Sequence, residues 1–317
     1  DIHTDTAREE APMAELIVNT EAVLHNYRHY AENGQVIPVL KSNGYALGAK
    51  QLQTLLAQQG AALFACATAD EALALAGEET DLLLLSCVHD MTLLRQLLQR
   101  RVIVSVESLA QAQAIDALHM DARIHLAVDS GFGRFGFLPE QVEDIKQVFA
   151  LKGVHVCGIF SHFRCRDAAP EQFARFSQVL LALSDYPVGL RHIAATHTAD
   201  IPQYRLDAVR IGSGLTGCGC SGLAHAAVMQ AQICAVRHLK PDLVAGERED
   251  RREDLRHGIE DDPQRALRRA AGGGIRAVAV QAVLDDIEIE ARKRHDAEIV
   301  DGVGAGQEFI VLIDRQF

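Results

Sequence analysis

The sequence has few of the features that would place the chain in a membrane or on nucleic acid. No apolar run approaches the roughly 18–20 residues that span a bilayer. The acidic N-terminal stretch, Asp1 to Glu15, has no apolar core of the kind found in signal peptides. The formal net charge is −12, whereas binding to phosphate backbones requires a basic face. We therefore expect a cytoplasmic protein that binds neither membranes nor nucleic acid.

The cysteines also lack a functional pattern. The seven are scattered, mostly within apolar runs: Cys66, Cys87, Cys157, Cys165, Cys218, Cys220 and Cys234. A chain of 317 residues can bury a core that needs no disulfide staples. The pair Cys218 and Cys220 has neither the spacing nor the second pair typical of zinc sites. Free thiols in a reducing compartment, and no metal site, are the prediction.

Short apolar runs alternate with amphipathic, helix-length segments from about Thr20 to Ala231. The predicted strands are Val36–Leu40, Leu63–Ala67, Asp81–Ser86, Val102–Val106, Ile124–Val128, Val156–Phe160, Arg191–Ala195 and Ala208–Ile211. The predicted helices are Ala49–Gln59, Ala69–Ala76, Met91–Gln99, Ser108–Leu118, Glu140–Ala150 and Gln172–Leu183. Strands without polar alternation indicate a parallel sheet covered by helices, and eight of them indicate an α/β fold of the (β/α)8 barrel type. A doubly wound sheet with fewer strands would give a similar pattern.

The composition changes after Lys240. Residues 247–270 contain 15 charged side chains in 24 positions, a density typical of an exposed connection. Short β-like runs follow at Ile275–Val283 and Phe309–Ile313. We therefore predict a barrel over residues 14–240 and a smaller, mainly β C-terminal domain over 241–317.

Lys41 directly follows the first predicted barrel strand. Active sites of this fold lie at the C-terminal ends of the strands, so Lys41 falls at the expected edge. A partly desolvated lysine there can lose its proton and form a Schiff base. An isolated lysine at a strand end is more often a solvated surface residue, so its neighbours decide the interpretation.

Those neighbours resemble the alanine racemase family, the fold type III pyridoxal-phosphate enzymes. Lys41, Asn43, Tyr45 and Gly48 match the family's lysine motif in spacing, and Ala14–Tyr27 resembles its opening strand and helix. Four further motifs follow in the family's order: Val128–Gly136, Gly158–Phe163, His192–Thr196 and Val209–Gly212. The resemblance covers about residues 14–240 and implies a pyridoxal 5'-phosphate cofactor.

The resemblance also implies roles for individual residues. Lys41 would hold the cofactor as a Schiff base and shuttle a proton at the substrate Cα, with Arg134 and His162 as the other catalytic residues. Arg134 would anchor the substrate carboxylate and the cofactor's phenolic oxygen, and His162 would lie near the cofactor ring. The remaining cofactor-binding residues would be Tyr45, Thr196, Gly212 and Ser213 at the phosphate, Arg210 at the pyridine nitrogen, and His192 beside Arg210.

Several positions depart from the family pattern. The family's carbamylated lysine corresponds to Ala127, its asparagine to Ala195 and its proline to Ile211. The family's second catalytic base is a tyrosine that the partner subunit's C-terminal domain supplies. All five tyrosines of this chain precede residue 205, so this base is missing. His257 and His295 are the histidines that remain after His238, and solvated surface residues are the simpler interpretation of both.

The sequence therefore predicts a pyridoxal-phosphate-dependent amino-acid racemase, with alanine as the leading substrate and a homodimer as the expected assembly. The alternatives are another fold type III enzyme, such as an ornithine-type racemase or a D-amino-acid aldolase or dehydratase, and a non-catalytic pyridoxal-phosphate-binding protein. The aldolases and dehydratases need metal ligands near the C-terminus, where His257 and His295 have no partner at ligand spacing. A visible spectrum and a chiral amino-acid assay would separate these possibilities.

Overall fold

The computed structural model describes residues 14–77, 79–218 and 221–231. The described residues fall into two units. One comprises Asn19–Ala226, and the described part of the other comprises residues 14–18 and 227–231. The predicted smaller domain over 241–317 lies outside the described residues, and so do His257 and His295.

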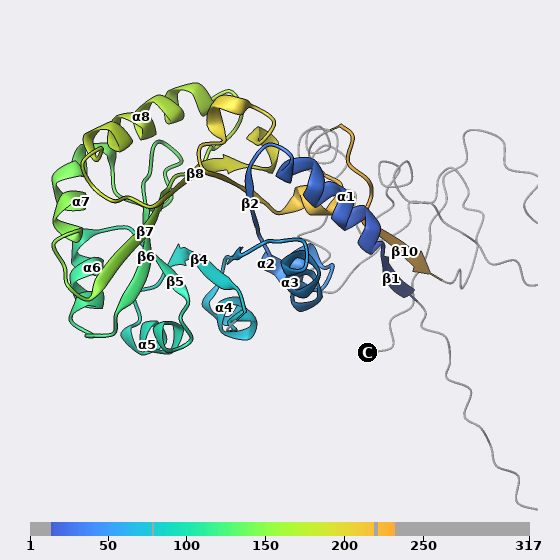
Figure 1. Ribbon diagram of the computed structural model, residues 1–317, viewed down its shortest axis with the longest axis horizontal. Coiled ribbons are helices and arrows are strands. Elements are labelled where there is room, and N and C mark those ends of the chain that lie inside the picture. Colours follow the sequence, from blue (N-terminus) through green and yellow to red (C-terminus); the bar gives the residue numbers. More distant parts are fainter. Residues whose placement is uncertain (1–13, 78, 219–220, 232–317) are drawn as a thin grey trace, which may run out of the picture. The chain divides into compact units, whose positions relative to one another are not determined.

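The unit Asn19–Ala226 is a closed barrel of eight parallel strands (Figure 1). The strands are β2 (Gln35–Pro38), β3 (Leu63–Cys66), β4 (Asp81–Cys87), β5 (Ile103–Val106), β6 (Ala122–Ala127), β7 (Val154–Phe160), β8 (Leu190–Ala195) and β9 (Ala208–Ile211). Consecutive strands from β3 to β9 are neighbours, and β9 pairs with β2. A parallel bridge between Val39 and Ala65, with a 2.7 Å bond from the Leu40 amide to the Ala65 carbonyl, joins β2 to β3. The predicted (β/α)8 barrel is confirmed, with strand ends displaced by at most two residues.

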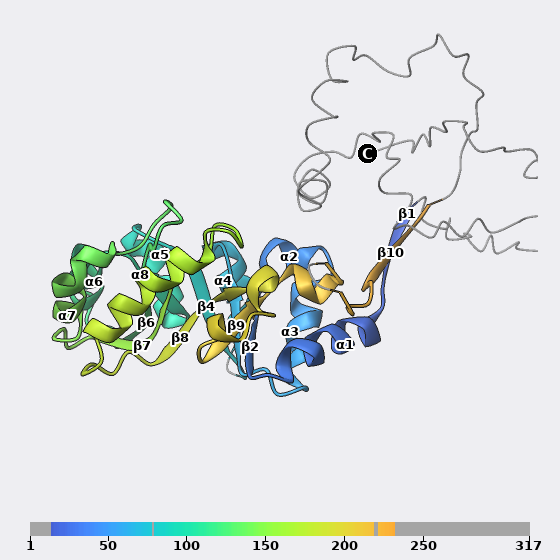
Figure 2. The same ribbon diagram turned by 90° about the horizontal axis from the view of Figure 1, so that it is seen from above.

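Helices cover the outside of the strands (Figures 1 and 2). They are α1 (Thr20–Ala31), α3 (Ala49–Ala57), α4 (Ala69–Leu75), α5 (Met91–Gln99), α6 (Leu109–Asp116), α7 (Val142–Val148) and α8 (Ala169–Ala182). The short element α2 (Lys41–Tyr45) is a left-handed turn and not a regular α-helix. Side-chain caps at Thr68, Asp90 and Ser108 start α4, α5 and α6, which explains why their beginnings were predictable. Between β8 and β9 the chain forms only the 3-10 turns η2 (Thr196–Thr198) and η3 (Pro202–Tyr204). None of the helices in the described part of the chain could cross a membrane.

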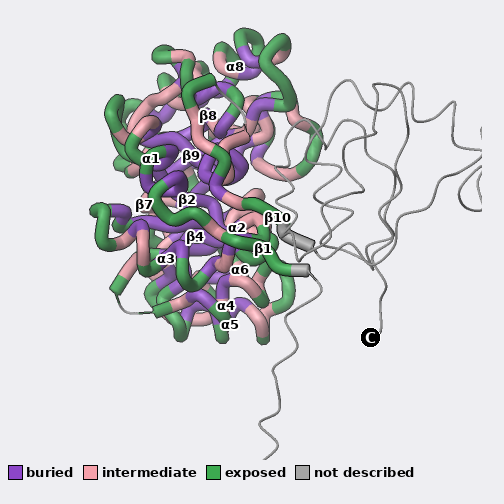
Figure 3. The backbone as a smooth tube through the Cα atoms, turned by 90° about the vertical axis from the view of Figure 1, so that its right-hand side faces the viewer, coloured by how far each residue is buried: buried purple, intermediate pink, exposed green. Residues whose placement is uncertain are grey.

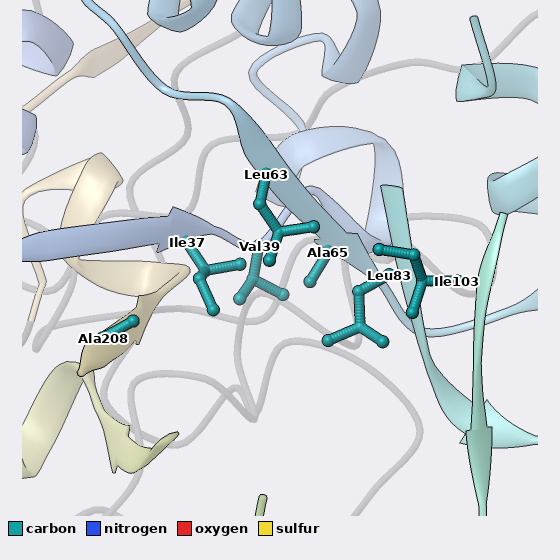
Figure 4. Packing of buried hydrophobic residues seen from close by; sticks show 7 residues of the cluster. All are labelled: Ile37, Val39, Leu63, Ala65, Leu83, Ile103 and Ala208. Atoms are coloured by element: carbon teal, nitrogen blue, oxygen red, sulfur yellow. The ribbon is translucent and has the colours of Figure 1, made fainter. Parts of the chain in front are cut away.

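The strands carry the core. In Figure 3 the strand segments are mostly buried, while the outer helices alternate between buried and exposed residues. One apolar cluster fills the interior between five strands (Figure 4): Ile37, Val39, Leu63, Ala65, Leu83, Ile103 and Ala208. Burying a side chain of the size of leucine or isoleucine contributes about 1.5–3 kcal/mol. This packing fixes the strand ends on which the polar residues of the site stand.

The described part of the other unit is a two-stranded antiparallel sheet. Strand β1 (Ala14–Val18) pairs with β10 (Ala227–Ala231), and Leu16 faces Met229 across the pair. The predicted opening strand and helix of Ala14–Tyr27 are therefore present as β1 and the start of α1.

Candidate active site

Lys41 lies just beyond β2, at the start of a left-handed turn. Ser42, Asn43, Tyr45 and Ala46 all have positive φ angles, between 53° and 70°. Such a conformation costs an L-residue about 1–2 kcal/mol, so other contacts must hold it. The Glu71 carboxylate accepts a 2.7 Å bond from the Ser42 amide, and the Asn43 side chain accepts one of 2.9 Å from the Ala49 amide. The turn thereby holds Lys41 at the C-terminal edge of the barrel.

Tyr45, at the end of that turn, reaches across to the segment after β9. A methyl group at Gly212 would overlap the Tyr45 hydroxyl, so a residue without a side chain is required there. Thr196 is buried and accepts a 3.2 Å bond from the Gly214 amide. Backbone N–H groups and hydroxyls gathered in one place suit a phosphate. Tyr45, Thr196, Gly212 and Ser213, the residues predicted for a phosphate, are therefore brought together.

Arg210 on β9 is 4% exposed and makes no ion pair with a described carboxylate. Its terminal nitrogens donate instead to neutral groups. The bonds run to the Ser161 carbonyl at 2.7 Å, to the Ile193 carbonyl at 3.1 Å, to His192 Nδ1 at 2.5 Å and to His162 Nδ1 at 3.1 Å. Burial lowers the pKa of Arg210 to about 9, so the guanidinium still carries its charge near neutral pH. Every hydrogen bond that Arg210 donates to a described acceptor comes from its terminal nitrogens, which leaves Nε–H available to a ligand.

His162 and His192 are neutral partners of this cation. Burial and then the Arg210 charge lower the pKa of His162 to about 3 and that of His192 well below its ordinary value. The His192 ring stacks on Phe160, with 5.2 Å between centroids. Because Arg210 donates to Nδ1 of His162, the proton of that ring lies on Nε2. His162 therefore has an N–H donor on the side away from Arg210.

Arg134 stands on a loop that Asp129 organises. The Asp129 carboxylate accepts from the amides of Gly131, Phe132, Gly133 and Arg134 at 2.8 to 3.1 Å. Burial opposes ionisation of Asp129, but these four bonds outweigh it and lower its pKa. With that carboxylate occupied, the Arg134 guanidinium lies over the rings of Phe132 and Phe135, at 4.5 and 4.8 Å from their centroids.

A small cleft, open to solvent, lies beside Arg134. Its lining combines apolar rings with polar groups: Ala127, Val128, Asp129, Phe132, Arg134, Phe135, Phe160, Ser161 and His162. Arg134 and His162, two residues predicted to be catalytic, therefore share one cleft. Ala127 lines it at the position where the family pattern has a carbamylated lysine.

The predicted site residues form two linked groups. In the first group the Lys41 amine lies 5.5 Å from the centroid of the Tyr45 ring, and Tyr45 contacts Gly212. In the second group His162 connects Arg210 to the cleft of Arg134. Sequence reasoning missed Glu71, which holds the turn after Lys41, and His125, which bonds to His192. The capping-box spacing of Thr68 and Glu71 was a usable signal for the first. For the second, a histidine inside an apolar strand was the one available signal.

Fold and site together define the class of protein. It is a (β/α)8 barrel whose C-terminal edge carries a lysine, a cradle suited to an anion and a buried arginine held by neutral acceptors. Residues 18–219 match the family model of the alanine racemase N-terminal domain. The chain belongs to this family.

Individual relatives support the same assignment. The alanine racemase of Desulforamulus reducens is 33% identical over 220 residues, which cover 63% of this chain and 59% of the relative. The structure of alanine racemase from E. faecalis is similar with a TM-score of 0.64 and 28% identity, covering 72% of this chain and 68% of that one. The Bartonella henselae alanine racemase with covalently bound pyridoxal phosphate has the same fold, with a TM-score of 0.66 at 23% identity over 76% of this chain and 72% of that one. The chain spans about three fifths of the length of the curated relatives it matches.

Proposed function

We propose that the chain is a pyridoxal-phosphate-dependent amino-acid racemase, an isomerase with alanine as its leading substrate. The observation that carries this proposal is the placement of Lys41 on the same barrel edge as the phosphate cradle and the buried Arg210. The family match and the names of the relatives support it. Free thiols at all five described cysteines are consistent with a cytoplasmic location.

The residues present fit this cofactor. The hydroxyls of Tyr45 and Thr196 and the backbone of Gly212 and Ser213 would hold its phosphate, and the Lys41 amine would attach it covalently. The Nε–H of Arg210 would donate to its ring nitrogen. When bound, the cofactor delocalises the electron pair that remains on the substrate Cα after proton removal. Arg210 keeps its own proton, so the ring nitrogen stays unprotonated and the delocalisation is limited, which favours simple proton exchange.

The residues of the cleft indicate which group of the substrate the protein would bind. Arg134 lies over two phenyl rings and makes no ion pair with a described carboxylate, so its guanidinium is available to bind the substrate carboxylate. The Lys41 amine would move a proton on and off the substrate Cα.

A racemase needs an acid–base group on each face of the substrate. Lys41 serves one face, and a group from the partner subunit of a homodimer serves the other.

Reduction with borohydride tests the cofactor assignment. The purified chain should absorb in the visible range, and peptide mapping after reduction should place the pyridoxyl group on Lys41. Lys41→Ala should lose both signals, while Lys50→Ala, which alters a neighbouring lysine bonded to Gln53, should retain them. A chiral amino-acid assay then tests the reaction. A pyridoxyl group on another lysine would refute the assignment of Lys41. If the chain binds the cofactor but converts no amino acid, it is a non-catalytic pyridoxal-phosphate-binding protein and the proposed reaction is wrong.

A further inference from the structure

We propose that His125 is a positioning residue, which joins His192 in a relay of two imidazoles that orients Arg210, and that Gly158 leaves the space for this relay. The relay is a property of the folded chain. Its effect on the cofactor rests on the function proposed above.

The relay crosses the barrel interior. His125 Nδ1 lies 3.0 Å from His192 Nε2, and His192 Nδ1 lies 2.5 Å from Arg210 Nη1. The three side chains come from β6, β8 and β9. Their exposed fractions are 1% for His125, 0% for His192 and 4% for Arg210. Bulk water therefore does not reach these bonds.

The charge on Arg210 determines every proton position along the relay. A guanidinium only donates, so His192 Nδ1 must accept and the His192 proton must lie on Nε2. That N–H donates to His125, so His125 Nδ1 must accept and its own proton lies on Nε2. Both rings then point an acceptor nitrogen toward the cation. In a low-dielectric interior such aligned dipoles reinforce one another.

Arg210 needs this support because no described carboxylate neutralises it. A buried cation is stable only when its surroundings supply acceptors in good geometry. If His125 were apolar, the His192 Nε2–H would have no acceptor along this line. The alternative His192 tautomer would place an N–H against Arg210. Either result loosens the guanidinium whose Nε–H we assign to the cofactor.

Gly158 makes the crossing possible. It lies on β7, between β6 and β8, and its register partner on β6 is His125. A Cβ atom there would overlap the His125 ring at three of its atoms. Gly158→Ala therefore displaces the relay without removing a polar group.

Imidazole ¹⁵N spectra of the full-length, cofactor-free chain test the relay directly. We expect His192 and His125 to show one protonated nitrogen each, on Nε2, and to remain neutral across pH 6 to 8. In His125→Leu the His192 signals should shift or broaden, and in His125→Asn, whose side-chain oxygen accepts at the same place, they should be restored. A His192 proton on Nδ1, or titration of His125 near pH 6.5, would overturn the proposal.

Pyridoxal-phosphate titration tests the consequence for the site. His125→Leu and Gly158→Ala should bind the cofactor roughly tenfold more weakly, the loss expected when a buried donor has no acceptor. His125→Asn should recover most of the affinity. Gly77→Ala is the matched control, because a Cβ there meets no atom within 4 Å. Its affinity should equal that of the parent chain.

The two proposals fail in different ways. Normal ¹⁵N signals in a chain that never binds pyridoxal phosphate would refute the proposed function and leave the relay intact. Normal cofactor affinity in a folded Gly158→Ala chain would refute the positioning role and leave the proposed function intact. If His125→Leu does not fold, the ¹⁵N spectra of Gly158→Ala and of the parent chain still test whether the relay exists.

Discussion

At the scale of single residues, the site depends on which carboxylates are already occupied. Asp129 lies close enough to Arg134 to influence it electrostatically, yet its oxygens accept from four backbone amides. The carboxylate therefore shapes the loop and leaves the guanidinium to a ligand. A sequence motif with an aspartate and an arginine does not distinguish this arrangement from an ion pair.

Asp129→Asn should make this loop more mobile, because an amide offers one acceptor oxygen in place of two. Since the folded-state pKa of Asp129 is lowered, its contribution to stability is present above about pH 4 and is lost as the pH falls through the folded-state pKa. Hydrogen exchange at the amides of residues 131–134 should accelerate in the variant at pH 6. The difference from the parent chain should shrink below pH 4. Asp185→Asn, at an exposed site, should leave these amides unchanged; equal protection in Asp129→Asn would contradict the assignment.

At the scale of elements, the turn after β2 is strained and the helices around it are regular. Helix α4 begins with a capping box in which Thr68 accepts from the Glu71 amide while the Glu71 carboxylate accepts from the Thr68 amide. The other oxygen of the same carboxylate accepts from Ser42. A well-formed helix start thus stabilises an unfavourable turn, and the turn places Lys41. Strain of this kind is concentrated at functional sites.

Ala46→Gly should stabilise the chain by about 0.5–1 kcal/mol, because Ala46 has a φ of 70° at the end of this turn and glycine adopts that conformation without a steric cost. Urea unfolding measures the change. Ala74→Gly, in the exposed part of α4 within its helical span, should instead cost about 1 kcal/mol. A loss of stability in both variants would show that the turn is not left-handed in solution.

At the scale of the whole molecule, the barrel keeps two buried histidines and the half-buried His162 neutral around one cation. Burial and then Arg210 lower the pKa of His125 and of His162 to about 3, and that of His192 well below its ordinary value. Arg123 also lowers the pKa of His125, while Asp81 raises it, and Arg134 and Lys41 lower that of His162. The folded chain thus excludes protons that the unfolded chain binds below about pH 6.5.

The free energy of unfolding should therefore fall as the pH is lowered from about 6.5, since the unfolded state binds up to three more protons. When all three histidines are protonated in the unfolded state and neutral in the folded state, the free energy of unfolding changes by about 4 kcal/mol per pH unit, which is ~1.4 kcal/mol for each histidine. Urea unfolding between pH 7 and 5 measures it before most carboxylates titrate. His125→Asn should reduce the slope by about a third, whereas His119→Asn, at an exposed histidine, should not change it. A flat profile would show that these histidines are protonated in the folded state.

The positions of most strands and helices could be predicted from the sequence, because they depend on the local pattern of apolar and capping residues. Continuous apolar runs and capping residues determine where the strands and helices lie, and Lys41 falls at a strand end for the same reason. The motifs also indicated which residues gather at the barrel edge. Helix α8 shows the limit, because it begins at Ala169, three residues before the predicted start, with Pro170 in its first turn.

Only the tertiary structure decided how the polar groups pair. His125 and His192 are 67 positions apart and lie on strands that are not neighbours. Closure of the barrel turns both side chains inward, and the missing side chain of Gly158 lets them meet. No local pattern encodes such a contact, because it depends on three strands at once. The neutral surroundings of Arg210 arise in the same way, since its acceptors come from β8 and from the segment that follows β7.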